Sequence, residues 1–184
     1  MLPEAKTHRI RLSRHVVVAT AVLMLIGALW VGNTIASDPN VQAVQAIAVD
    51  TLTLEHTFGY PDATHPKFTK TDVPRLRVQA DELARSHYVG TLLATRIRDF
   101  QNVVDVMESG ELTLIDGGAK DVSFISTDVN ADTATVVLRA TVWSSVLSRD
   151  GTTASPTSTN VWTLKLAKVG PKWFVSAVDS DFQG

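Results

Sequence analysis

The sequence changes character at Gly110, and this change constrains the fold more than any other feature. Before Gly110, apolar residues recur at intervals of three and four, the spacing of one face of a helix. After it, turn residues separate segments rich in β-branched and aromatic residues, which predict strands. These segments are ELTLI, KDVSFISTDV, DTATVVLRATVWSSVL, NVWTLKLAKV and KWFVSAVDSD. Helices followed by strands predict an α+β fold with an antiparallel sheet.

Three helices are expected before the sheet. The first follows Ser37, its expected N-cap, and ends near Phe58. The second begins at Thr71 or Asp72, with Pro74 in its first turn, and ends before a glycine that follows Tyr88. The third carries one apolar stripe and is expected to end at Gly110; the stripe consists of Leu93, Ile97, Phe100, Val104 and Met107.

The strand segments predict a meander. From Thr133 to Val142 apolar and mixed positions alternate, so that one face is buried and the other is not. Asn130 to Asp132 suits a tight hairpin turn, Ser148 to Asn160 reads as a polar loop, and Val169 to Lys172 joins the last two strands. Sequential hairpins of this kind give an antiparallel sheet.

Residues 16–36 form an apolar run, and basic residues precede it. The run is about 20 residues long, enough for a helix to cross a hydrocarbon core of about 30 Å. The basic residues are Lys6, Arg9, Arg11 and Arg14. The length favours a transmembrane signal anchor, although a signal peptide cleaved after Ala36 and a buried core helix are the alternatives.

The basic flank predicts that the N-terminus stays in the cytoplasm. The expected organisation is therefore a cytoplasmic basic tail at 1–15, a signal anchor at 16–36 and an exported domain at 37–184. The protein would be a single-pass protein of the cell membrane.

Composition narrows the function classes. A length of 184 residues fits one compact domain with an appendage. Because cysteine is absent, disulfides, thiolate metal sites and a cysteine nucleophile are excluded. A net charge of −2 offers no broad surface for nucleic acid. No glycine-rich phosphate loop is present, and we expect no cofactor and no metal.

The expected final hairpin, NVWTLKLAKVGPKWFVSAVDSDF, resembles the C-terminal element of the nuclear transport factor 2-like superfamily, which includes ketosteroid isomerase and SnoaL-like proteins. The resemblance is carried by Trp162, Leu164, Leu166, Gly170, Lys172, Trp173 and Val175. It implies a cone-shaped domain in which about three helices pack on a curved antiparallel sheet. The connection GYPDATHPKFTKTDVP is longer than the resemblance implies.

With an anchor added, the layout is similar to two membrane-anchored groups: Mce-associated membrane proteins, and assembly factors of type IV secretion and conjugation. The segment from Ser86 to Val142, which contains DTATVVL, resembles the Mce-associated pattern. This resemblance implies a non-catalytic scaffold or interaction subunit of a bacterial envelope complex. Its partners would be other subunits, or itself, and the membrane, with no nucleic acid. The alternative is a small-molecule binder or isomerase-like enzyme that uses the cone pocket.

Enzymes of the superfamily place acid and base groups inside the cone, which makes His56, Tyr60, His87 and Tyr88 the pocket candidates. His56 also lies near Asp62 and His65 in the sequence, and such a cluster could bind a metal or act as a base. Their spacing matches no tight metal motif, so a loop role is favoured.

Two tryptophans and one carboxylate complete the candidates. Trp143 and Trp162 lie in strand patterns, where they favour packing, and partner contact is the alternative. Asp99 follows two arginines on the expected third helix and is expected to be a solvated or paired charge.

Overall fold

The structure is a computed structural model that describes residues 38–62, 64, 65 and 67–182. Its elements are α2 (Pro39–Glu55), the 3-10 helix η1 (Lys70–Asp72), α3 (Val73–His87), α4 (Gly90–Ser109), β1 (Leu112–Val129), β2 (Thr133–Ser148), β3 (Thr153–Ala154), β4 (Thr157–Val169) and β5 (Lys172–Phe182). The expected tail and anchor at 1–36 lie outside the described residues. Among those described, no helix is both long and apolar enough to cross a membrane.

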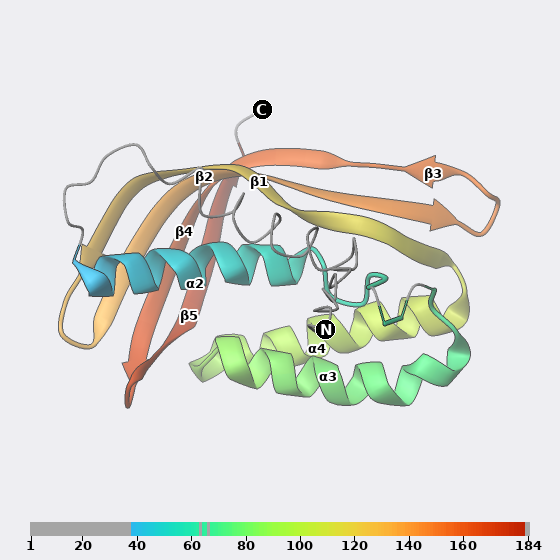
Figure 1. The fold of residues 1–184 in the computed structure, drawn as a ribbon, viewed down its shortest axis with the longest axis horizontal. Helices are drawn as coiled ribbons and strands as arrows, with labels where there is room; N and C mark the ends of the chain where they lie inside the picture. The colour runs from blue at the N-terminus through green and yellow to red at the C-terminus, as the bar shows by residue number, and fades with distance from the viewer. Residues whose placement is uncertain (1–37, 63, 66, 183–184) are drawn as a thin grey trace, which may run out of the picture. The chain divides into compact units, whose positions relative to one another are not determined.

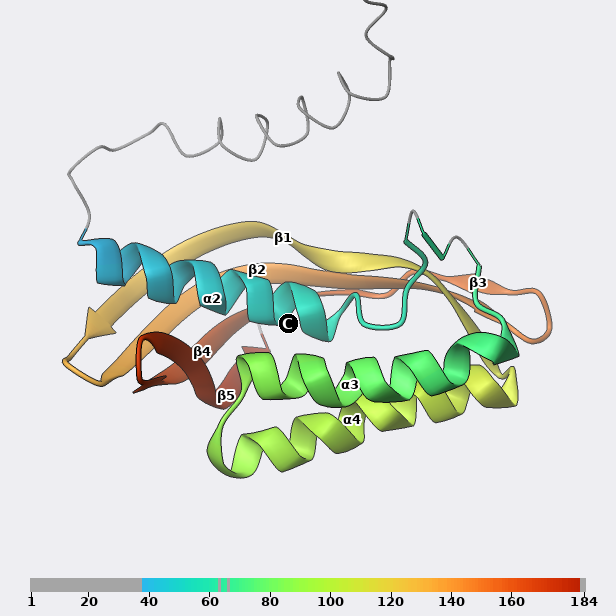
Figure 2. The ribbon, with the colours of Figure 1, turned by 60° about the horizontal axis from the view of Figure 1, so that its bottom comes forward.

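The predicted α+β meander is confirmed. The strands pair antiparallel in the order β1-β2-β4-β5, and the short β3 pairs with β2. The sheet curves, and α2, α3 and α4 all lie on one side of it (Figures 1 and 2). One face of the sheet therefore builds the core with the helices, while no described helix covers the other.

The core follows the predicted alternation of β2. The buried positions of this strand are Ala134, Val136, Leu138, Ala140 and Val142. Leu164 and Leu166 continue the same face on β4, and Leu52 and Val104 oppose them from the helices. Burial of each such aliphatic side chain stabilises the fold by about 1.5–3 kcal/mol.

Local chemistry sets the ends of α2. Asp38, and not Ser37, is the N-cap, because its carboxylate accepts a hydrogen bond from the backbone N–H of Asn40 at 2.8 Å. The helix ends at Glu55, before the expected end near Phe58. The backbone N–H of Phe58 still reaches back to the Leu54 carbonyl at 3.0 Å, so the chain continues as a turn.

The other helix ends agree with the sequence. Asp72 belongs to a capping box with Thr69 before α3, and Pro74 lies in the first turn of that helix. Gly110 ends α4 in the left-handed conformation at φ 73°, which glycine adopts without a steric penalty.

Two regions contain more strand than expected. The segments ELTLI and KDVSFISTDV belong to one strand, β1, which passes through Gly117 and Gly118. Register irregularities let β1 bend while it stays paired with β2. The stretch 148–160, expected as a polar loop, turns back tightly where the Ser148 N–H donates to the Thr152 carbonyl at 2.8 Å. Beyond this turn, β3 and then β4 pair with β2.

Candidate functional site

A largely buried polar cluster connects the three α-helices on the concave side of the sheet. Glu55 ends α2, Tyr88 follows α3, and Arg96 lies on α4. The Tyr88 hydroxyl donates to Glu55 Oε1 at 2.9 Å, and Arg96 Nη2 lies 2.9 Å from the same oxygen. Arg96 Nη1 also donates to Asp99 Oδ2 at 3.0 Å. We refer to Glu55, Tyr88, Arg96 and Asp99 as the Glu55 cluster.

Burial controls the electrostatics of this cluster. Tyr88 is fully buried, and the side chains of Glu55 and Arg96 are only 12% and 22% exposed. Burial raises the pKa of Glu55 above its usual value, although the Arg96 charge and the Tyr88 hydrogen bond oppose the increase. Burial, and then the neighbouring Glu55, raise the pKa of Tyr88. The phenol therefore stays protonated and acts as a donor.

Of the four pocket candidates from the sequence, Tyr88 belongs to the Glu55 cluster and His56 follows Glu55 directly in the chain. The His56 ring packs edge-on against Trp162, with a centroid distance of 6.4 Å. Burial lowers the pKa of His56, and the positive charge of Arg96 lowers it further. His56 is therefore a neutral ring beside the Glu55 cluster at pH 7.

His87 and Tyr60 lie elsewhere. His87 Nε2 is 3.0 Å from Asp50 Oδ2 on α2, and His87 also lines a surface pocket of about 330 Å³ together with Trp173. Tyr60 lines a different pocket, of about 390 Å³, between the connection after α2, helix α3 and strand β1. The four candidates therefore do not form one site.

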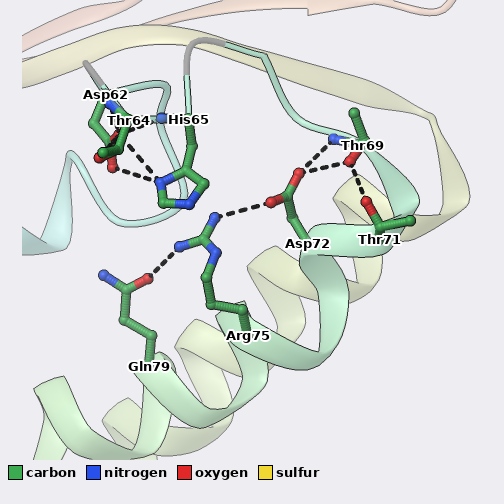
Figure 3. A network of polar contacts seen from close by, with 8 residues as sticks. All are labelled: Asp62, Thr64, His65, Thr69, Thr71, Asp72, Arg75 and Gln79. Carbon is green, nitrogen blue, oxygen red and sulfur yellow. Dashed lines mark hydrogen bonds and ion pairs between the residues drawn. The ribbon is translucent and has the colours of Figure 1, made fainter.

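The pocket beside Tyr60 is lined by Asp62, His65 and Asp72 of the long connection. Figure 3 shows the polar contacts of these residues. Asp62 accepts hydrogen bonds from the Thr64 hydroxyl at 2.8 Å, from the Thr64 N–H at 2.8 Å and from the His65 N–H at 2.6 Å. These bonds, first that of the Thr64 hydroxyl and then that of the His65 backbone, lower the pKa of Asp62 to about 2. The Asp62 carboxylate therefore accepts its hydrogen bonds from Thr64 and His65 of its own turn.

The opposite wall of this pocket is also internally paired (Figure 3). Arg75 contacts Asp72 at 3.3 Å and Gln79 at 3.2 Å. Across the described part of the chain, no three His, Asp or Glu side chains are grouped so as to hold a metal ion. His56 packs on Trp162, while Asp62 and His65 bond each other, so His56 lies apart from the other two side chains.

Sequence reasoning missed the two charges at the centre of the cluster. It predicts Asp99 to be a solvated or paired charge, and Asp99 is indeed paired with Arg96. It assigns nothing to Glu55, and Arg96 enters only as one of the two arginines before Asp99. One signal was available: α2 is an otherwise uncharged helix that carries only Asp50 and Glu55.

The two tryptophans occupy opposite faces of the sheet. Trp162 is 9% exposed on the helix side, and its Nε1 has no hydrogen-bond partner among the described residues. This position favours packing over partner contact. Trp143 alternates with the buried Val142 and is half-buried on the face without helices, where its indole lies beside Gly118.

Comparison with known proteins assigns no family. No family model matches the chain, and no curated protein matches it. One similar solved structure is the intermembrane space region of the chloroplast protein ARC6, with 12% identity and a TM-score of 0.49 over 78% of this chain and 97% of that one. Another is a periplasmic fragment of TraM, with 12% identity and a TM-score of 0.49 over 77% and 96%. A putative NTF2-like transpeptidase from Campylobacter jejuni has 20% identity and a TM-score of 0.24 over 59% and 93%.

Proposed function

We propose that this protein is a non-catalytic, membrane-anchored scaffold or interaction subunit of a bacterial envelope complex, of the Mce lipid-transport type or of the conjugation and secretion type. The observation that supports the proposal most is the state of the concave side of the sheet. Its charged groups, Glu55, Arg96 and Asp99, are paired with one another, and Tyr88 also bonds Glu55. Buried apolar side chains such as Phe100 lie beside them.

Acid-base catalysis requires a free acid or base beside a space for substrate. Glu55 is bonded to both Tyr88 and Arg96, and its side chain is only 12% exposed. The neighbouring Phe100 ring is 3% exposed and lies 6.4 Å from the Tyr88 ring, centroid to centroid. None of the four residues of the cluster lines either of the two pockets described above. These features favour a structural role for the cluster.

The helix-free face of the sheet offers a surface for a partner. It exposes Arg139 and Lys165, and it presents the half-buried Trp143. Thr141 and Thr159 bond across adjacent strands at 2.9 Å, which keeps this face regular. Arginine and tryptophan are enriched in interfaces between proteins.

The proposed arrangement in the cell has a cytoplasmic tail at 1–15, a single transmembrane anchor at 16–36 and an exported domain at 37–184. The apolar length and the basic flank support this topology. Protease added to intact spheroplasts should degrade the domain and spare the tail. Complete protection of the domain would contradict the proposed location.

In-cell photo-crosslinking tests the interaction role. A photo-crosslinking amino acid placed at Lys165, on the helix-free face, should capture a subunit of an envelope complex. The matched control is Val78, which is 59% exposed on α3. Crosslinks at Lys165 that are absent at Val78, identified by mass spectrometry as envelope subunits, are the expected result. Equal background at both positions would count against the proposal.

One observation favours a second candidate, a small-molecule binder or isomerase-like enzyme. Glu55, with its raised pKa, and Tyr88 form an acid and phenol pair on the concave side. This candidate predicts that small apolar ketones raise the unfolding temperature of the native chain and not that of the folded Glu55→Gln variant. The scaffold role predicts no such shift for either protein.

A further inference from the structure

We propose that the free edge of β5, from Ala177 to Asp181, accepts an extended basic segment of a partner protein as an additional strand. The inference rests on the proposed interaction role and specifies the chemistry of the partner. The inference rests on three observations: the covering of the sheet edges, the regularity of their pairing and the position of unpaired charges.

β5 is an edge strand whose first half is already covered. The link between α3 and α4 runs beside it: Tyr88 forms a parallel bridge with Val175, and the Val89 N–H donates to the Val175 carbonyl at 3.0 Å. This edge therefore accepts main-chain pairing. The pairing with the link ends at Val175.

The second half of the edge remains free in the described structure. β5 stays paired with β4 along its inner side as far as the match of Asn160 with Phe182. Within residues 38–182, no backbone hydrogen bond from outside β4 is found for 177–181. An edge strand with unpaired backbone groups is a template for strand addition.

The opposite edge, β1, carries features that prevent strand addition. Its register shifts at three places, and Asp121 has a positive φ of 53°. Helix α2 also lies along it, with Gln45 Nε2 donating to Thr127 Oγ1 at 2.9 Å. Bulges and covering elements are the usual protection of an edge. The one register shift of β5 lies at Ser176, just before this run, and the pairing with β4 is regular from Ala177 to Asp181. This regular run is therefore the edge available to a partner.

Charge defines the partner. Asp179 and Asp181 are exposed, and neither is in an ion pair within the described residues. They share the helix-free face, whereas Val178 between them packs against the core. A strand paired beside them would place its own side chains about 4.5–5.5 Å away. Basic residues alternating with an apolar residue fit this pattern. A second copy of β5 would bring like charges together, which disfavours self-pairing.

The test uses the full chain in detergent micelles and a fluorescent nine-residue peptide of alternating lysine and valine. Fluorescence anisotropy should show saturable binding. Replacement of every lysine by glutamate should abolish binding. The double variant Asp179→Asn with Asp181→Asn should weaken binding roughly 2- to 30-fold, the range for two cross-strand charge pairs. The matched control, Asp121→Asn with Asp128→Asn on β1, removes the same charge and should leave binding unchanged.

N-methylated peptides test the main-chain pairing. Only alternate N–H groups of an added strand face β5. One peptide, methylated at alternate positions that face β5, should lose binding, and the peptide methylated at the other positions should keep it. Equal loss for both, or equal weakening by the β1 and β5 variants, would show general charge attraction and overturn the proposal. NMR signals of the β5 edge that shift with protein concentration in the absence of peptide would also overturn the proposal, because they would identify a second copy of this chain as the occupant of the edge.

Failure of this inference is separable from failure of the interaction role. If the peptide does not bind while the Lys165 crosslink to an envelope subunit persists, strand addition at β5 is wrong and the interaction role stands. Unfolding temperatures of the two double variants verify that both are folded.

Discussion

Substitution of Arg96 by methionine tests the account of the Glu55 cluster most directly. Methionine keeps the length of the aliphatic stem and removes the charge that lies 2.9 Å from Glu55 Oε1. Removal of one partner of a fully buried ion pair costs about 3–5 kcal/mol. Because Arg96 retains 22% exposure, we expect a smaller loss of about 2–3 kcal/mol at pH 8.

The pH dependence of the Arg96→Met variant has a definite sign. Without Arg96, burial raises the pKa of Glu55 further above its usual value of 4.5. A folded state with a raised carboxyl pKa binds the proton more tightly than the unfolded state does. The variant is therefore least destabilised below pH 4.5, and it loses stability as the pH rises through the folded-state pKa.

Thermal unfolding of the full chain, followed by tryptophan fluorescence, measures both effects. A loss of 2–3 kcal/mol corresponds to a fall of roughly 4–12 °C in the unfolding temperature at pH 8. The double variant Arg96→Met with Glu55→Gln removes both charges and should recover to within about 1 kcal/mol of the native chain. A single variant that loses equal stability at pH 4 and pH 8, or a double variant as unstable as the single one, would refute the reasoning.

Two further predictions concern positions where the backbone or its hydrogen bonds dominate. A Cβ at Gly117 would lie 2.1 Å from the His56 carbonyl, so Gly117→Ala should cost more than about 3 kcal/mol in urea unfolding. At Gly90, φ is 66° and no heavy atom lies within 4 Å of such a Cβ. Gly90→Ala should therefore lower the free energy of unfolding by only about 1–2 kcal/mol. Similar losses for the two variants would contradict this prediction. Asp62 should titrate at about 2 by NMR, and its stabilising contribution should be lost as the pH falls from 3.8 toward that value; a midpoint at 3.8 would show that the turn does not hold the carboxylate.

The parts of the fold that depend on neighbours in sequence could be predicted. Alternation along β2 gives the buried face, Gly110 ends α4, and Pro74 marks the start of α3, because each signal acts within one or two turns. The hairpin at 148–160 was missed because its residues resemble a loop, and only pairing with β2 makes them strands.

The Glu55 cluster could not be predicted by the same means. Tyr88 and Glu55 are 33 residues apart, and they come from elements whose relative positions only the packed core determines. A glutamate at the end of an apolar helix indicates that a carboxylate is buried there and needs polar partners. It does not indicate which distant arginine or tyrosine provides them.

Tyr88 belongs to two parts of the domain at once. Its backbone pairs with the β5 edge at Val175, and its hydroxyl holds the Glu55 carboxylate. A strand bound just beyond Val175 and a proton bound at Glu55 would therefore act on the same residue. Thermodynamic linkage is reciprocal, so any factor by which the strand changes proton affinity is the factor by which the proton changes strand affinity. Tyr88 is thus the residue through which contact at the sheet edge and charge in the interior would be coupled in this domain.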